Sequence, residues 1–155
     1  MAQLSLLHLN GTNGNNGPYT DSIGTFTWAR AGTTVVFDTS ISKFGGCSIV
    51  GTTGYLNQTN TFTAVTSWTA DCWFYISASA QGIMNCNNAG AGGFTTGGKW
   101  NSTSTGASYH VSLTGAADNS GTITGTKTSW TTGTWYHFEM CYDNAAQKFY
   151  FYIDG

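Results

Sequence analysis

The stretch "TWYHFEMCYDNAAQKFYFYIDG", from Thr134 to Gly155, decides the fold. Its first half alternates between two sets of side chains, Tyr136, Phe138, Met140 and Tyr142 against Trp135, His137, Glu139 and Cys141. The second half alternates in the same way, with Phe149, Phe151 and Ile153 against Lys148, Tyr150 and Tyr152. A two-residue period is typical of a strand with two distinct faces. Because the polar turn "DNAAQ" joins the halves, the stretch predicts an antiparallel hairpin.

The stretch closes with Asp154-Gly155, a pair typical of the two-residue type I′ turn, in which both residues have positive φ. Such a turn leads into a returning strand, and the sequence given shows none after Gly155. We expect either that the protein is longer than this chain, which we favour, or that a neighbouring chain covers the open edge of the last strand.

Composition favours a folded domain whose surface is polar but carries few charges. The chain has 155 residues, of which 40% are hydrophobic, and we expect one domain, residues 1–155, with a core of its own. Charged residues make up 8%, against about 25% in an average soluble protein. Since few charges give weak repulsion between molecules, this composition suits a protein held in an assembly or outside cells.

Charge and hydropathy argue against two classes of partner. The net charge is −2, and the five basic residues are scattered singly, at Arg30, Lys43, Lys99, Lys127 and Lys148. We expect no nucleic acid partner, because such binding needs clustered positive charge. No run approaches the ~20 apolar residues of a membrane span, and the N-terminus lacks the basic segment of a signal peptide, so we expect no membrane partner.

Short strand patterns recur along the rest of the chain, separated by Gly- and Asn-rich turns. They lie at residues 4–9, 25–30, 33–37, 47–50, 55–59, 70–77, 82–87, 109–113 and 121–127, with two more near Phe94 and Trp100. No window shows a sustained helical period bounded by caps. The sequence therefore predicts an all-β fold, an antiparallel β-sandwich. The segment 70–77 is aromatic on both faces, so we expect both of its faces to be covered.

The four cysteines, Cys47, Cys72, Cys86 and Cys141, lie far apart without the spacing of metal ligands. We expect no metal site and no cofactor. Without an export signal, buried free thiols are the default. A bridge between Cys72 and Cys141 stays open for a protein that finishes outside a cell.

Several stretches resemble, in the right order, the concanavalin A-like lectin/glucanase superfamily in its laminin G-like jelly-roll branch. They are "LLHLNGTNG" (6–14), "YTDSIG" (19–24), "SKFGGCSIVGTTGYL" (42–56), "FTAVTSWTADCWFYIS" (62–77) and "GTWYHFEMCYDNAAQKFYFYIDG" (133–155). The resemblance implies a jelly roll, here without the final strands that usually follow the Asp-Gly turn. The residues themselves agree with this: Phe44 would be a bulky anchor before a bend at Gly45-Gly46, and Trp73 and Trp135 would pin two sheets together.

The glucanases of this superfamily use paired acidic residues on one strand. Here Glu139 has His137 and Cys141 as neighbours at two-residue spacing, and Asp143 falls in the predicted turn. Because retaining hydrolysis needs two carboxyl groups about 5–5.5 Å apart, we expect no enzymatic activity and no catalytic residues.

The remaining polar candidates have structural interpretations that we prefer. His8, His110 and His137 lie in apolar strand patterns and are expected to be core or interface residues. Asp118-Asn119 and Asp143-Asn144 each offer one carboxylate, so they indicate Asx turns rather than calcium sites. Trp100 and Tyr109, in the Gly-rich segment "GGKWNSTSTGASYH", are the candidate carbohydrate-binding residues, since exposed aromatic rings stack on sugars.

Many laminin G-like domains similar to this chain, with nearly uncharged surfaces and no signal peptide, belong to bacteriophage virions. The resemblance therefore implies a non-enzymatic structural or adhesion module, in a tail fibre or as capsid decoration. Such a protein is made in the host cytoplasm and finishes in the virion, where its partners are other virion proteins or copies of itself. The alternative is an extracellular, lectin-like module that binds host or cell-surface glycans.

Overall fold

The computed structural model describes residues 7, 9–24, 26–32, 34–51, 54–58, 67–77, 82–86, 97–103, 106–112, 119–123, 130–146 and 148–155, with backbone alone for four of the strands, β6 to β9. Every regular element in these ranges is a β-strand, and every pair of strands is antiparallel. The prediction of an all-β fold is confirmed in this part of the chain. The chain divides into two compact units, Met1–Thr61 and Phe62–Gly155. The prediction of one domain over 1–155 stays a prediction.

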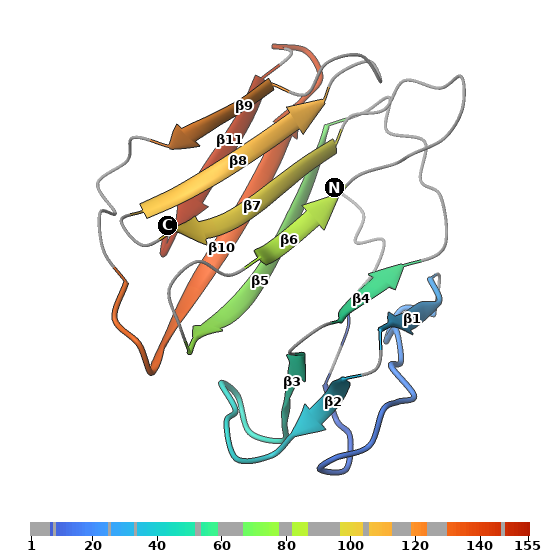
Figure 1. Cartoon of the computed structure of the whole chain (residues 1–155). Coiled ribbons are helices and arrows are strands. Elements are labelled where there is room, and N and C mark those ends of the chain that lie inside the picture. The colour runs from blue at the N-terminus through green and yellow to red at the C-terminus, as the bar shows by residue number, and fades with distance from the viewer. Residues whose placement is uncertain are drawn as a thin grey trace. The chain divides into compact units, whose positions relative to one another are not determined.

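The first unit contains two short two-stranded antiparallel pairs (Figure 1). Strand β1 (Trp28–Ala31) pairs with β4 (Tyr55–Gln58), and β2 (Val35–Asp38) pairs with β3 (Ser48–Gly51). The second unit contains two larger sheets. One has the order β11-β10-β5, with bounds Lys148–Ile153, Thr134–Asp143 and Trp68–Ile76. The other runs β6-β7-β8-β9, with bounds Gly82–Cys86, Gly97–Thr103, Gly106–Ser112 and Asn119–Ile123.

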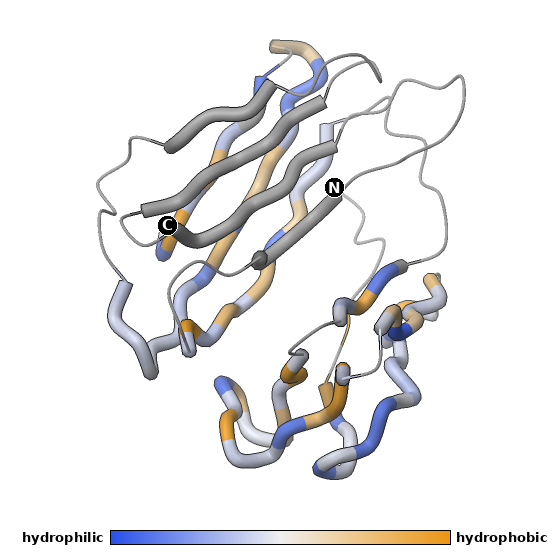
Figure 2. Tube along the Cα trace, viewed as in Figure 1, coloured by the Kyte–Doolittle hydropathy of each residue, from blue (hydrophilic) through white to orange (hydrophobic). Residues whose placement is uncertain are grey.

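Strand β10 is the centre of the three-stranded sheet, and the alternation read from the sequence fixes which face is buried. Its buried residues are Tyr136, Phe138, Met140 and Tyr142. On the adjacent strands, the apolar residues of the same face are Cys72, Phe74 and Ile76 of β5 and Phe151 and Ile153 of β11. We call this surface the inner face. Trp130 packs on it, with its ring 5.5 Å from that of Phe138 and stacked. Apolar residues alternate with more polar ones along β5 in Figure 2.

The β10–β11 hairpin forms with the bounds that the sequence predicts, because the turn between its strands has suitable residues. The Asp143 carboxylate accepts the backbone N–H groups of Ala145 (2.9 Å) and Ala146 (3.2 Å), which makes it an Asx turn, as predicted. At the other end, Asp154 and Gly155 have φ of 58° and 100°. Both values lie in the region that a type I′ turn requires of its two central residues, but such a turn also needs the residue after Gly155, so the turn itself stays a prediction.

The first unit has its own small core around Val35 and Phe37. The Tyr19 hydroxyl donates to the Val35 carbonyl at 3.0 Å, and the Tyr19 ring lies 5.1 Å from that of Phe37. Burial raises the pKa of Tyr19. Gly54 packs closely against this core, since a Cβ there would lie 2.6 Å from the Val35 side chain and 2.7 Å from the Ala31 backbone oxygen. A residue without a side chain is therefore required at this position.

Two expectations from the sequence are wrong. Phe44 is 77% exposed and is not a buried anchor, although Gly45 and Gly46 do make the expected bend, with φ of 81° and 91°. Trp73 and Trp135 lie on adjacent strands of one sheet and so do not pin two sheets together.

The two cysteines that could have formed a bridge are also separated by the sheet. Cys72 packs on the inner face, whereas Cys141 alternates with the buried residues of β10 and lies on the opposite face. Cys47, Cys72 and Cys141 are free thiols, as we expected for a chain without an export signal. The side chain of Cys86 lies outside the described part of the chain.

Candidate functional site

The face of the β5–β10–β11 sheet opposite the inner face is the most chemically varied surface that the structure describes. We call it the outer face. Its members are Thr69, Asp71, Trp73 and Tyr75 of β5, Trp135, His137, Glu139, Cys141 and Asp143 of β10, and Lys148, Tyr150 and Tyr152 of β11. They come together because residues directly opposite in an antiparallel pair share a face.

Aromatic rings of this face are accessible to solvent. Trp73 is 38% exposed, Tyr150 40% and Tyr152 42%. The Trp73 ring lies 5.0 Å from the imidazole of His137, which holds one side of the indole in place. The prediction that both faces of the strand at 70–77 are covered is therefore wrong at Trp73. Large, partly exposed rings held by packing are the residues that binding surfaces use as anchors.

Two carboxylates lie directly opposite each other in the middle of the outer face. Asp71 of β5 is in register with Glu139 of β10. Spacing along the strand of Glu139 indicated no second carboxylate on its face, and this expectation is wrong, because Asp71 lies on the adjacent strand. The alternation of "WTADCWFYI" does place Asp71 opposite the apolar side, but the register that brings it to Glu139 is not a local property.

His137 of β10 and Asp71 of β5 form a contact between adjacent strands, which the sequence did not predict. The Asp71 Oδ2 lies 3.0 Å from the His137 Nε2, with side-chain exposures of 57% and 25%. The His137 backbone N–H donates to the Asp154 carboxylate at 2.9 Å, which connects β10 to the residue that follows β11. His137 therefore lies on the outer face and is not a core residue, and its assignment as an interface residue stays a prediction.

Glu139 makes the polar contact expected for a strand-face carboxylate. The Cys141 thiol donates to Glu139 Oε1 at 3.1 Å and accepts from the Thr69 hydroxyl at 3.3 Å. Burial raises the pKa of Cys141, the Thr69 hydrogen bond lowers it, and the nearby Glu139 and Asp71 charges raise it further. The net shift is upward, so the thiol stays protonated near neutral pH and is a poor nucleophile there.

This arrangement offers stacking surfaces and hydrogen-bond acceptors on an open sheet face. A general acid for glycoside hydrolysis is a carboxyl group with a raised pKa in an apolar setting beside the bound sugar. Here the Asp71 side chain is more than half exposed and bonded to an imidazole, while Glu139 accepts a bond from a thiol. The geometry therefore favours binding over acid–base chemistry.

The candidate carbohydrate-binding residues read from the sequence lie on the other sheet of this unit. Trp100 of β7 is directly opposite Tyr109 of β8, and Tyr109 is opposite Gly121 of β9. Their side chains, and that of His110, are outside the described part of the structure, as are His8 and Asp118. The pairing in register is a finding, and their role in binding stays a prediction.

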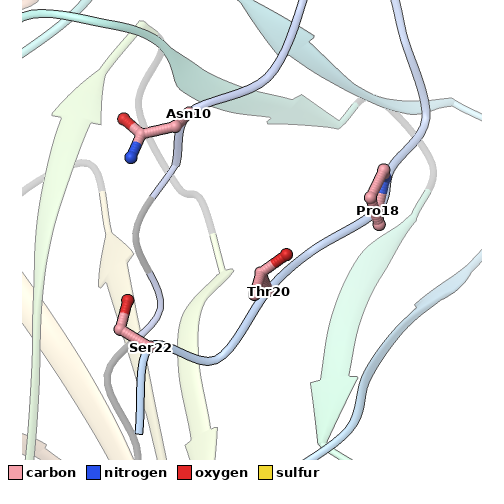
Figure 3. A pocket seen from close by; sticks show the side chains of 4 residues that line it. All are labelled: Asn10, Pro18, Thr20 and Ser22. Carbon is pink, nitrogen blue, oxygen red and sulfur yellow. The ribbon is translucent and has the colours of Figure 1, made fainter. Parts of the chain in front are cut away.

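A small pocket lies in the first unit, far in sequence from the outer face. It has a volume of about 260 Å³ and is lined by Asn10, Pro18, Thr20 and Ser22 (Figure 3). The nearby carboxylate of Asp21 is buried and already accepts the backbone N–H groups of Ile23 and Phe26 at 2.9 and 3.1 Å. The four described lining residues are uncharged.

Among the described residues, no group of three or more His, Cys, Asp or Glu side chains is arranged to hold a metal ion. Within the same part of the chain, no helix has the length and apolar character to cross a membrane. Comparison of this chain with protein-family models, with curated proteins and with solved structures finds no match.

Proposed function

We propose that this chain is a non-enzymatic structural and adhesion module of a bacteriophage virion, in a tail fibre or as capsid decoration. It acts through contacts with other virion proteins or with copies of itself. The observation that carries the proposal is the outer face, where three rings exposed by about two fifths stand on a sheet whose opposite face is apolar and largely buried. A rigid sheet with accessible anchors serves attachment without any moving part.

We propose for the second unit the finer fold that the resemblance implies, an antiparallel sandwich of the concanavalin A-like jelly-roll kind. It is supported by the two antiparallel sheets of that unit and by the continuous apolar inner face of one of them. A sheet with one apolar face must cover that face with another layer to be stable in water. The register of both sheets is compatible with such a sandwich.

Contact through the outer face would follow the usual anatomy of a specific interface. Stable interfaces bury more than about 1,000 Å², and a few central aromatic residues supply most of the binding energy. Trp73 and Tyr152 are suited to that central role, because they flank Glu139 and Asp71 on two sides. The low charge of the chain also lowers the desolvation cost of a large contact.

The proposal is tested in purified particles. Mass spectrometry of the virion should detect the chain, and a particle map should place it at a tail or capsid surface. A variant with Trp73→Ala and Tyr152→Ala should fold but be lost from particles. The matched control is Tyr55→Ala, which removes an exposed ring of the first unit and should leave incorporation unchanged. Particles that lack the wild-type chain altogether would refute the proposal.

The alternative, a lectin-like module for host or cell-surface glycans, is favoured by the same exposed rings. Aromatic faces stack on pyranose rings, and carboxylates such as Asp71 and Glu139 accept hydrogen bonds from sugar hydroxyls. Glycan-array binding lost on Trp100→Ala would assign the binding to the Trp100 and Tyr109 site. Binding lost on Trp73→Ala instead would assign it to the outer face.

A further inference from the structure

We propose that the pocket of the first unit binds one pyranose residue of an uncharged glycan. The inference rests on the lectin-like alternative stated above and gives it a site that uses no residue of the outer face. It starts from the side chains that line the pocket, which are Asn10, Pro18, Thr20 and Ser22 (Figure 3). All four residues are exposed, so a ligand can reach them from solvent.

The polar side chains of the pocket have unused hydrogen-bonding groups. Within the part of the chain that the structure describes, the amide of Asn10 and the hydroxyls of Thr20 and Ser22 make no hydrogen bond. By contrast, the side-chain oxygen of Asn13 in the same unit accepts the Thr39 backbone N–H at 3.1 Å. Amides and hydroxyls both donate and accept, and so do the hydroxyls of a sugar, so the two sets of groups are complementary.

Asn10 is held in position by the residues on either side of it. The buried thiol of Cys47 donates to the Leu9 carbonyl at 2.9 Å and accepts the Gly11 backbone N–H at 3.2 Å. Two hydrogen bonds to one buried sulfur fix the backbone that carries the Asn10 amide. A group that is already fixed costs less conformational entropy when it binds a ligand.

The opposite wall of the pocket is fixed in a similar way. Residues 18–22 alternate between exposed and buried side chains, and successive side chains of an extended segment point to opposite sides. The buried members are Tyr19 and Asp21, whose side chains are hydrogen-bonded to backbone groups. These two anchors keep Thr20 and Ser22 pointing outward, into the pocket.

The size and charge of the pocket select the ligand class. Its volume of about 260 Å³ lies just below the range of roughly 300–1,000 Å³ for sites of drug-sized ligands, so it suits a smaller ligand such as one monosaccharide. A charged ligand would lose hydration without gaining an ion pair from the described lining residues, which are uncharged. Pro18 adds a rigid apolar ring that can contact the C–H groups of a pyranose.

The test titrates the isotope-labelled 155-residue chain with the methyl glycosides of glucose, galactose and mannose, and follows its amide signals by NMR. At least one glycoside should bind with a dissociation constant of about 1–10 mM, since a small ligand without an aromatic platform binds weakly. The signals that move should be the side-chain amide of Asn10 and the backbone amides of Thr20 and Ser22. The indole signal of Trp73 on the outer face should not move.

Variants and a second probe separate a site from a general effect of polyols. Thr20→Val keeps the shape of the side chain without its hydroxyl, and it should weaken binding by about threefold to tenfold, as should Asn10→Ala. The matched control is Thr12→Val, which changes another exposed threonine of the first unit and should leave the affinity unchanged. Sorbitol, which has the hydroxyls of a hexose without the ring, should bind more weakly than the glycoside.

Each other outcome overturns the inference in a recognisable way. Shifts confined to Trp73 and its neighbours would refute the pocket and support the lectin-like alternative at the outer face. Binding of none of the three glycosides would refute the inference, and an empty glycan array in addition would refute the alternative itself. Equal weakening by Thr12→Val, or sorbitol binding as tightly as the glycoside, would show that the pocket is not a specific site.

Discussion

The inner and outer faces of β10 differ in almost every physical respect although their residues alternate along one strand. The inner residues Tyr136, Phe138, Met140 and Tyr142 are nearly without solvent contact. The outer residues are partly exposed, and the charged or titratable ones among them are His137, Glu139, Cys141 and Asp143. Successive side chains of a strand point to opposite faces of the sheet. Residues that stabilise the fold and residues available for binding therefore alternate along β10.

This comparison teaches that substitutions on the two faces should have different consequences. A change on the inner face should act on the free energy of unfolding. A change on the outer face should act on binding, with little effect on the fold, because solvent can replace most of the lost contacts there. The following experiments test that separation, beginning with the largest effect.

Phe138→Ala should give the largest effect. Phe138 is 1% exposed, and its ring contacts those of Phe74 at 6.2 Å and Trp130 at 5.5 Å. Removing it leaves a cavity in the inner face, and we expect the free energy of unfolding to fall by about 3–5 kcal/mol. Urea denaturation measures this change. The adjacent Glu139→Gln is the matched control and should stay within about 0.5 kcal/mol of the wild type. Equal losses in the two variants would contradict the separation.

Trp73→Ala should produce a smaller effect and on a different property. Because the indole is partly exposed, we expect a loss in the free energy of unfolding of about 1 kcal/mol or less. Binding to the virion partner or glycan should weaken by about tenfold or more, as for a central aromatic anchor. A large fall in stability with unchanged binding would mean that Trp73 belongs to the core.

Glu139→Gln should change the titration of Cys141 slightly. Burial is the main cause of the raised pKa of Cys141, and Glu139 adds to it through a hydrogen bond and its charge. Loss of that charge lowers the pKa, so alkylation of Cys141 by iodoacetamide should be faster at a given pH. Peptide-resolved mass spectrometry measures the rate, with Cys47 as the internal control. A slower reaction would contradict the contact between Glu139 and the thiol.

The same raised pKa has a consequence for stability. The folded chain favours the protonated thiol of Cys141, so this contribution to stability is complete below the unfolded pKa, near 9.0, and is lost as the pH rises through the folded value. Cys141→Ser should flatten the fall in stability above pH 9. An unchanged pH profile in that variant would show that Cys141 is not the group responsible.

Glu139→Gln should have no effect on polysaccharide hydrolysis, because we expect no hydrolysis by the wild type. We expect wild type and Glu139→Gln to release the same background of reducing sugar from any glycan, because an open, hydrogen-bonded carboxylate pair lacks the acid that retaining hydrolysis needs. Activity of the wild type that disappears in Glu139→Gln would overturn the non-enzymatic proposal.

The parts of the fold that the sequence predicts are those governed by local rules. The bounds of β10 and β11 follow from alternation, and the turn at Asp143 follows from the residues that such a turn requires. No helix was predicted, and none occurs in the described ranges. These features need no knowledge of which strand pairs with which.

The features that depend on register could not be predicted. Asp71 and Glu139 meet because β5 and β10 align at one of several possible registers, and the choice depends on how the whole inner face packs. Trp100 and Tyr109 were chosen together for their composition, and their direct pairing emerges from the structure. Phe44 was assigned to the core by its hydrophobicity, but the bend after it leaves the ring in solvent.

Hydroxyl-radical footprinting of the free chain and of assembled particles tests the central claim most directly, because it reports the exposure of each ring. We predict that Trp73 and Tyr152 are oxidised in the free chain and protected in the particle, while Tyr136 and Tyr142 are protected in both. Rapid oxidation of Tyr136 and Tyr142 in the free chain, or unchanged oxidation of Trp73 in the particle, would contradict the division between a buried inner face and a binding outer face.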